Sequence, residues 1–154
     1  IVFSSVAVSF VVLISNLAVF GIFYLFANLA FDLNMLLFLL YLLQLCIVTL
    51  GVAFFLSALY PKLRDLFHIW QVLLQVGFWA TPITYILQIV PQKYTTLVMA
   101  NPLAGIINNS RLALINHQFP DVGSFLYTLA AGVILLASGY FLFFRRAPFF
   151  AEEV

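Results

Sequence analysis

The spacing of the charged residues is the feature that most limits what this chain can form. Its 154 residues include only six basic and five acidic side chains. They leave four long uncharged stretches, at 1–31, 33–61, 66–92 and 122–144. Each stretch exceeds the roughly 20 apolar residues that a helix needs to cross a hydrocarbon core. The sequence therefore predicts four transmembrane helices, at about 4–28, 35–59, 67–90 and 122–144.

The composition excludes most other classes of protein. Apolar residues make up 66% of the chain and charged residues 7%, against about 25% charged in a typical soluble domain. Disorder requires low hydrophobicity and high charge, and a net charge of +1 offers no footprint for nucleic acid. The single cysteine, Cys46, supports neither a disulfide framework nor a thiolate metal site. We expect one all-α integral membrane domain and, because Ile1 lies inside an apolar run, part of a longer protein.

The region 91–120 differs from the four spans because proline interrupts it twice. Pro91 can open a short helix, and Asn101 can cap a second one that has Pro102 at its first position and runs to about Asn116. Helices of roughly 10 and 15 residues rise only about 15 and 22 Å, too little to cross a core of about 30 Å. Because both are apolar, the pattern predicts an external re-entrant helical hairpin. Two helices lying flat on the membrane surface are the alternative.

The distribution of basic residues predicts the orientation. With four spans, the loop 60–66 and the tail 145–154 lie on one side of the membrane, and the hairpin lies on the other. The first side carries Lys62, Arg64, Arg145 and Arg146, and the second carries Lys93 and Arg111. Because cytoplasmic segments carry the excess of Lys and Arg, we expect the loop and the C-terminal tail in the cytoplasm.

The third predicted span has one polar and aromatic face. At 100° per residue, one arc holds Trp70, Gln71, Gln75, Phe78, Thr81, Tyr85 and Gln88, and the opposite arc is aliphatic. Amides are costly against lipid, so the polar arc should face protein or a transport pathway. Hydrogen bonding and packing between helices is the alternative use of such residues. Pro82 should kink this helix.

The sequence gives little support for enzymatic chemistry. No carboxylate lies inside a predicted span, and His68 and His117 fall on opposite sides of the membrane in the predicted topology. The HExxH, GxSxG and P-loop motifs are missing from the sequence. We therefore predict no catalytic residue, no metal site and no cofactor on this chain. Arg111 is a separate case, because a charge in an apolar helix must snorkel, line water or pair, here with Asp121 or Asp32.

Three strings resemble the permeases of type-2 ABC exporters, in particular the exporters of polysaccharides and polyol phosphates. "LYPKLRDLFHIWQVLLQVGFWATPITYIL" (59–87) is similar to the segment that joins the fourth and fifth spans of that family, including Arg64-Asp65 and the string from Trp79 to Tyr85. "ANPLAGII" (100–107) and "FFAEEV" (149–154) resemble strings after the external hairpin and near the C-terminus. The order and spacing of the strings also agree with the family.

The resemblance implies that this chain is the C-terminal part of a six-span permease in the cytoplasmic (inner) membrane. The family works as a permease dimer with two ATP-binding subunits, which bind the ATP and Mg, and it exports lipid-linked glycans such as O-antigen, capsule or teichoic acid. The alternatives are an exporter of drugs or other hydrophobic molecules and a structural membrane subunit without a pathway.

The resemblance also assigns roles to residues of this sequence. The translocation pathway would include Trp70, Gln71, Gln75, Phe78, Trp79, Thr81 and Tyr85. The external gate would include Asn101, Pro102 and Arg111. The contact with the ATP-binding subunit would include Lys62, Arg64 and Asp65, for which a solvated turn is the alternative interpretation.

Overall fold

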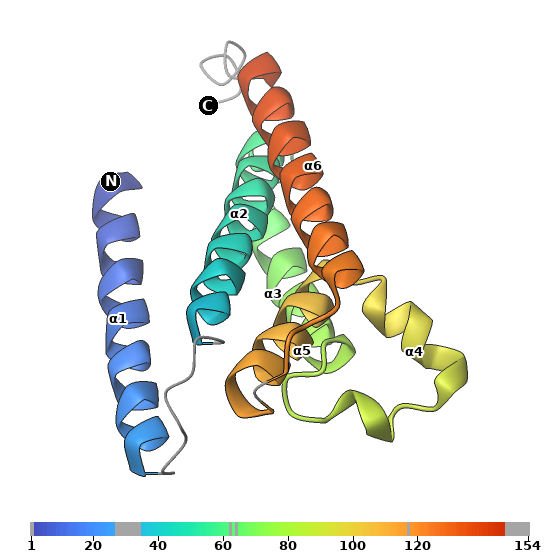
Figure 1. Ribbon diagram of the computed structural model, residues 1–154. Helices are drawn as coiled ribbons and strands as arrows, with labels where there is room; N and C mark the ends of the chain where they lie inside the picture. The colour runs from blue at the N-terminus through green and yellow to red at the C-terminus, as the bar shows by residue number, and fades with distance from the viewer. Residues whose placement is uncertain (1, 27–34, 62, 64, 117, 147–154) are drawn as a thin grey trace. The chain divides into compact units, whose positions relative to one another are not determined.

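A computed structural model of the chain confirms the all-α prediction: the residues that it describes form helices and no strands (Figure 1). The described residues are 2–26, 35–61, 63, 65–116 and 118–146. The chain divides into two compact units, 1–32 and 33–154. Helix α1 (Val2–Phe26) belongs to the first. The second contains α2 (Met35–Leu59), α3 (Leu66–Ala80), the 3-10 turn η1 (Leu87–Ile89), α4 (Gln92–Met99), α5 (Pro102–Ile115) and α6 (Val122–Arg146).

Three of the predicted spans correspond closely to long helices. Helices α1, α2 and α6 have 25 residues each, so each rises about 37 Å, more than the roughly 30 Å of a hydrocarbon core. By length and composition, α2 and α6 are candidates for crossing a membrane. Within α1, Val11–Phe26 form a shorter apolar helix.

Helices α2 and α6 pack along each other and form the main body of the second unit (Figure 1). Two glycines permit this close approach. A Cβ atom added to Gly139 would lie 2.5 Å from the carbonyl oxygen of Gly51, and one added to Gly51 would lie 2.7 Å from the backbone nitrogen of Leu136. Small residues at a helix crossing are typical of membrane proteins, where van der Waals packing holds helices together.

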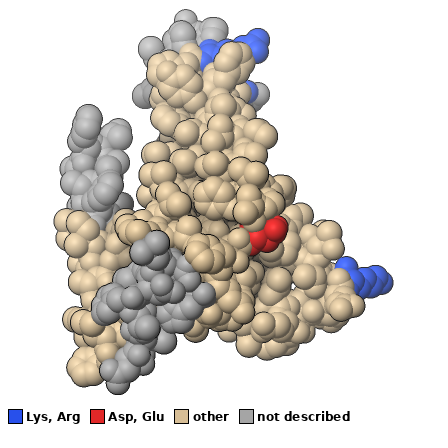
Figure 2. All heavy atoms as spheres, in the orientation of Figure 1, with Lys and Arg blue, Asp and Glu red and all other residues tan. Residues whose placement is uncertain are grey.

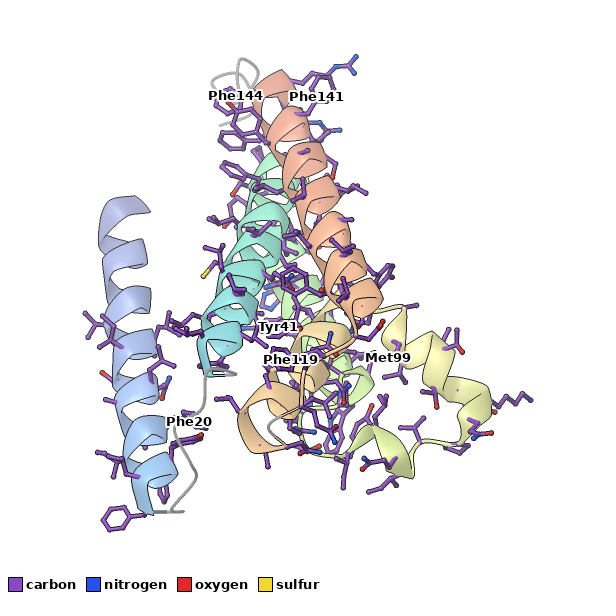
Figure 3. All side chains as sticks on the ribbon, viewed as in Figure 1. Phe20, Tyr41, Met99, Phe119, Phe141 and Phe144 are labelled. Carbon is purple, nitrogen blue, oxygen red and sulfur yellow. The ribbon has the colours of Figure 1, made fainter. Side chains whose placement is uncertain are left out.

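Helix α5 packs against both α2 and α6. Its buried side comprises Ala104, Gly105, Ile106, Asn109, Ala113 and Leu114. Ile106 joins a core with Tyr41 and Val48 of α2, and Figure 3 shows Tyr41 between α2 and α5. A Cβ atom on Gly105 would lie 2.6 Å from the Cγ2 atom of Thr128 in α6, so glycine again permits a close contact between helices.

Helix α3 ends earlier than the third predicted span. The prediction placed this span at 67–90 with a kink at Pro82, whereas the helix ends at Ala80. Thr81 is extended, with φ −104° and ψ 136°, because proline disfavours helical backbone in the residue before it. Pro82 also has no N–H to donate. The prediction of one helix through residue 90 is therefore wrong, and Tyr85 does not lie on α3.

The predicted break between the two short helices is confirmed. Pro91 directly precedes α4, and Asn101 caps α5 with Pro102 at the start of the helix. The Asn101 side-chain oxygen accepts a hydrogen bond from the backbone N–H of Leu103 at 3.1 Å. This contact satisfies one of the backbone donors that a helix start leaves free.

In the view of Figure 2, basic side chains lie at two extremities of the second unit, and an acidic patch lies between them. Basic side chains are visible at the C-terminal end of α6, which carries Arg145 and Arg146, and on α4, which carries Lys93. Uncharged surface along α6 separates them. Phe141 and Phe144 lie at the same end of α6 as the two arginines (Figure 3). Arginines at the end of a long apolar helix are typical of a membrane–water interface, because their charged groups can reach water.

Candidate functional site

The side chains predicted to line a pathway have different environments. Gln71, Gln75, Phe78 and Trp79 are exposed on α3, Trp70 and Tyr85 are half-buried, and Thr81 is buried. The aliphatic side of α3, with Val72 and Val76, is equally exposed. In the described part of the chain α3 makes no extensive contact with another helix. The exposed amides and rings on α3 are therefore available to a neighbouring molecule or to a pathway.

Thr81 differs from the other predicted pathway residues because its hydroxyl is engaged within the chain. The Thr81 side chain donates a hydrogen bond to the carbonyl oxygen of Gly77 at 2.7 Å. It accepts one from the side-chain amide of Asn101 at 3.1 Å. Because Asn101 also caps α5, its two side-chain atoms connect the end of α3 to the start of α5. The two motifs that contain these residues, Thr81-Pro82 and Asn101-Pro102, are thus in direct contact.

The guanidinium of Arg111, on α5, bonds the segment that follows α3. Its Nη1 atom donates to the carbonyl oxygen of Tyr85 at 3.2 Å, and its Nη2 atom donates to that of Ile83 at 3.1 Å. Asp121, a predicted partner of Arg111, instead accepts from the backbone N–H of Ser124 at 2.9 Å and caps α6. The other predicted partner, Asp32, lies outside the described residues.

A buried polar cluster between α2, α5 and α6 was missed by the sequence analysis. The Thr128 hydroxyl lies 3.0 Å from the Oε1 atom of Gln44, whose amide donates to the carbonyl oxygen of Phe125 at 3.3 Å. Asn109 donates to the hydroxyl of Ser124 at 2.9 Å. Polar residues inside otherwise apolar helices were the available signal, because such groups need partners in a membrane.

The same cluster shows how far α5 extends along its neighbours. Gln44 and Thr128 lie about 13 and 9 Å from the first residues of α2 and α6, at 1.5 Å per residue. Gly105 of α5 contacts Thr128 directly. The stretch of α5 from Gly105 to Asn109 therefore lies beside the first two turns of α6, where Gly105 meets Thr128 and Asn109 bonds Ser124.

The predicted contact with an ATP-binding subunit is described only in part. Lys62 and Arg64 lie outside the described residues, as does the tail 147–154. Asp65 is exposed, and its backbone carbonyl accepts from the N–H groups of His68 and Ile69 at 3.1 Å each. Within the described residues, no three His, Cys, Asp or Glu side chains cluster as a metal site would require.

Comparison with curated proteins finds relatives with a named function. Over 108 residues, 69% of this chain, it is 30% identical to the O-antigen export system permease protein RfbA of Myxococcus xanthus, and the match covers 42% of that protein. Over 107 residues, again 69% of this chain, it is 32% identical to the protein of the same name from Klebsiella pneumoniae, with 40% of that protein covered. No protein-family model matches the chain.

The chain thus spans about two fifths of the length of the curated relatives that it matches. Both relatives are permeases of the polysaccharide export class to which the strings at 59–87 and 100–107 are similar. The resemblance seen in the sequence is therefore confirmed: this chain is a relative of the permeases of O-antigen export systems.

Proposed function

We propose that this chain is part of the permease subunit of an exporter that moves a lipid-linked polysaccharide or polyol phosphate across the cytoplasmic membrane. The observation that carries the proposal is the match to two O-antigen export permeases over 69% of the chain. ATP and Mg would be bound by a separate subunit, and hydrolysis there would drive transport. The chain itself would be a transport subunit and not an enzyme.

Four segments would cross the membrane in this protein. The lengths and compositions of α2 and α6 support two of the crossings. Helix α3 has 15 residues and rises about 22 Å, so the third crossing would need residues 81–90 in addition to the helix. The loop 60–66 and the C-terminal tail would face the cytoplasm, as the distribution of Lys and Arg predicts.

The hairpin 91–120 would be a re-entrant outer gate. This role is supported by the position of Gly105 of α5, which lies beside Thr128 of α6, about 9 Å along α6 from its first residue. Backbone that is interrupted inside a membrane is tolerated where protein or water covers it. Helix α5 meets this condition, since six of its residues are buried.

The pathway would run along the exposed amides and rings of α3, between two copies of the permease. Sugar rings stack on aromatic faces, and sugar hydroxyls pair with amides, so Gln71, Gln75, Phe78 and Trp79 suit a glycan. Their exposure within one chain supports this role, because an amide in a membrane requires a partner. A second permease copy and the glycan itself would supply those partners.

The test replaces the native permease of an O-antigen exporting host with the full-length protein that contains this chain, together with its own ATP-binding subunit. Surface glycan is measured by immunoblot. Loss of one hydrogen bond or stacking contact of about 1 kcal/mol corresponds to a roughly fivefold change in binding. We expect Gln75→Leu and Phe78→Ala to lower export by at least that factor while expression and dimerisation stay close to wild type.

Val76→Leu, on the aliphatic side of α3, is the matched control and should export normally. Normal export in both Gln75→Leu and Phe78→Ala would show that this side of α3 serves packing only. Extrusion of hydrophobic drugs without any glycan export would favour the drug-exporter alternative. Failure to transport either class would favour a structural subunit.

A further inference from the structure

The end of α3 leaves backbone carbonyl groups without helical hydrogen-bond partners. Beyond Ala80 the backbone turns without helical pairing until η1, so carbonyl groups there have no partner in a helix. In a membrane such groups must be satisfied by the protein or by water. Arg111 supplies two donors, to Ile83 at 3.1 Å and to Tyr85 at 3.2 Å. Both terminal nitrogens of its guanidinium are therefore engaged by backbone oxygens.

A second set of contacts fixes the same region to α6. The Tyr127 hydroxyl of α6 donates to the carbonyl oxygen of Ala100 at 2.7 Å. The next residue, Asn101, donates to Thr81 at 3.1 Å. Thr81 and Pro82 are both buried. The segment that follows α3 is thus connected to α5 by Arg111 and Asn101, and Ala100, the residue before Asn101, is bonded to Tyr127 of α6.

These contacts matter because α3 has little other support from the chain. Leu66, at the opposite end of α3, is the buried residue within this helix. By contrast, α2, α5 and α6 share a core and a buried polar cluster. The position of α3 relative to this three-helix block therefore depends on the contacts at residues 81–85.

We propose that Asn101 and Arg111 are positioning residues that form an outer clasp on residues 81–85. The clasp holds this segment on α5 and beside α6, and it thereby sets where the exposed face of α3 lies beside the export pathway. The effect of the clasp on the pathway rests on the proposed function, whereas the clasp itself rests on the contacts described above. Two of the five N–H donors of the Arg111 guanidinium bond backbone carbonyl oxygens, so the contacts that the structure shows for this side chain hold backbone.

Hydrogen–deuterium exchange tests the clasp in the full-length permease bound to its ATP-binding subunit in nanodiscs. The readout is exchange at 83–90, followed at the amides of Ile83, Ile89 and Val90, which donate backbone hydrogen bonds. Arg111→Met removes both donors, and Thr81→Val removes the acceptor for Asn101. Each should accelerate exchange by about tenfold, since a hydrogen bond of roughly 1.4 kcal/mol holds a tenfold difference in the opening equilibrium. Exchange in α2 and α6 should not change.

Two conservative variants provide the matched controls. Thr81→Ser keeps the hydroxyl and should keep wild-type exchange at 83–90. Arg111→Lys keeps the charge but offers a compact ammonium in place of a planar fork, so its exchange should lie between those of wild type and Arg111→Met. Export, measured per molecule at the surface, should fall in the order of increasing exchange.

Three results would overturn the proposal. If both Arg111→Met and Thr81→Val exchange at 83–90 at the wild-type rate, the side-chain contacts of the clasp do not stabilise this segment. Faster exchange that also extends through α2 and α6 would show general destabilisation. Full export despite faster exchange at 83–90 would show that the clasp does not position the pathway. The exchange measurement requires no glycan. A wild-type protein that fails to export glycan would therefore refute the proposed function, while the exchange rates at 83–90 would still test the clasp.

Discussion

The glycine contact between α2 and α6 gives the most quantitative prediction. Alanine at position 139 would place its Cβ atom 2.5 Å from the Gly51 carbonyl oxygen and 3.2 Å from the backbone nitrogen of Phe55. Real Cβ atoms essentially never approach closer than 3.0 Å, so the helices must separate by about half an ångström or more. Both contacting atoms belong to the backbone of α2 and cannot rotate away.

The expected cost follows from this geometry. Overpacking of this kind costs about 1–3 kcal/mol, and the better helix propensity of alanine returns up to about 1 kcal/mol. We therefore expect Gly139→Ala to lower the free energy of unfolding by about 1–2 kcal/mol. At roughly 2–4 °C per kcal/mol for a chain of this size, the melting temperature should fall by about 2–8 °C.

The assay is thermal denaturation of the purified full-length permease in detergent, followed by fluorescence-detected size exclusion. Gly21→Ala is the matched control, because a Cβ atom on Gly21 of α1 meets nothing within 4 Å. This control should leave the melting temperature unchanged or raise it slightly. Equal melting temperatures for Gly139→Ala and Gly21→Ala would refute the close contact between α2 and α6.

Two further predictions concern topology and the buried polar cluster. In a Cys46→Ser background, we expect an impermeant thiol reagent applied outside the cell to label Tyr94→Cys but not Tyr60→Cys, and the reverse pattern would invert the proposed orientation. We expect Thr128→Val to destabilise the protein by about 1–3 kcal/mol, because it leaves the buried side-chain oxygen of Gln44 without its donor. Gln44→Leu should cost less in the same melting assay, because the Thr128 hydroxyl also lies within 3.1 Å of two backbone carbonyl oxygens of its own helix, and a larger loss for Gln44→Leu would contradict this reasoning.

The long helices and the position of the break in the hairpin can be predicted from the amino-acid sequence. The bounds of α1, α2 and α6 follow from uncharged stretches, because helical hydrogen bonds are local and a membrane excludes charge. The start of α5 follows from Asn101-Pro102, because a side-chain cap and a proline act on the nearest turn. The family resemblance was also present in short strings such as the one at 100–107.

Contacts between helices that are distant in the sequence determine where α3 ends and which residues bond the segment that follows it. Pro82 permits either a kink or a stop, and the choice depends on whether the freed carbonyls find donors elsewhere in the chain. Arg111, which lies 28 residues after Ile83, supplies those donors. Thr81, which was predicted on the pathway face, instead accepts a hydrogen bond from Asn101. Periodicity along a helix carries no information about such partners, because they depend on how separate helices pack in space.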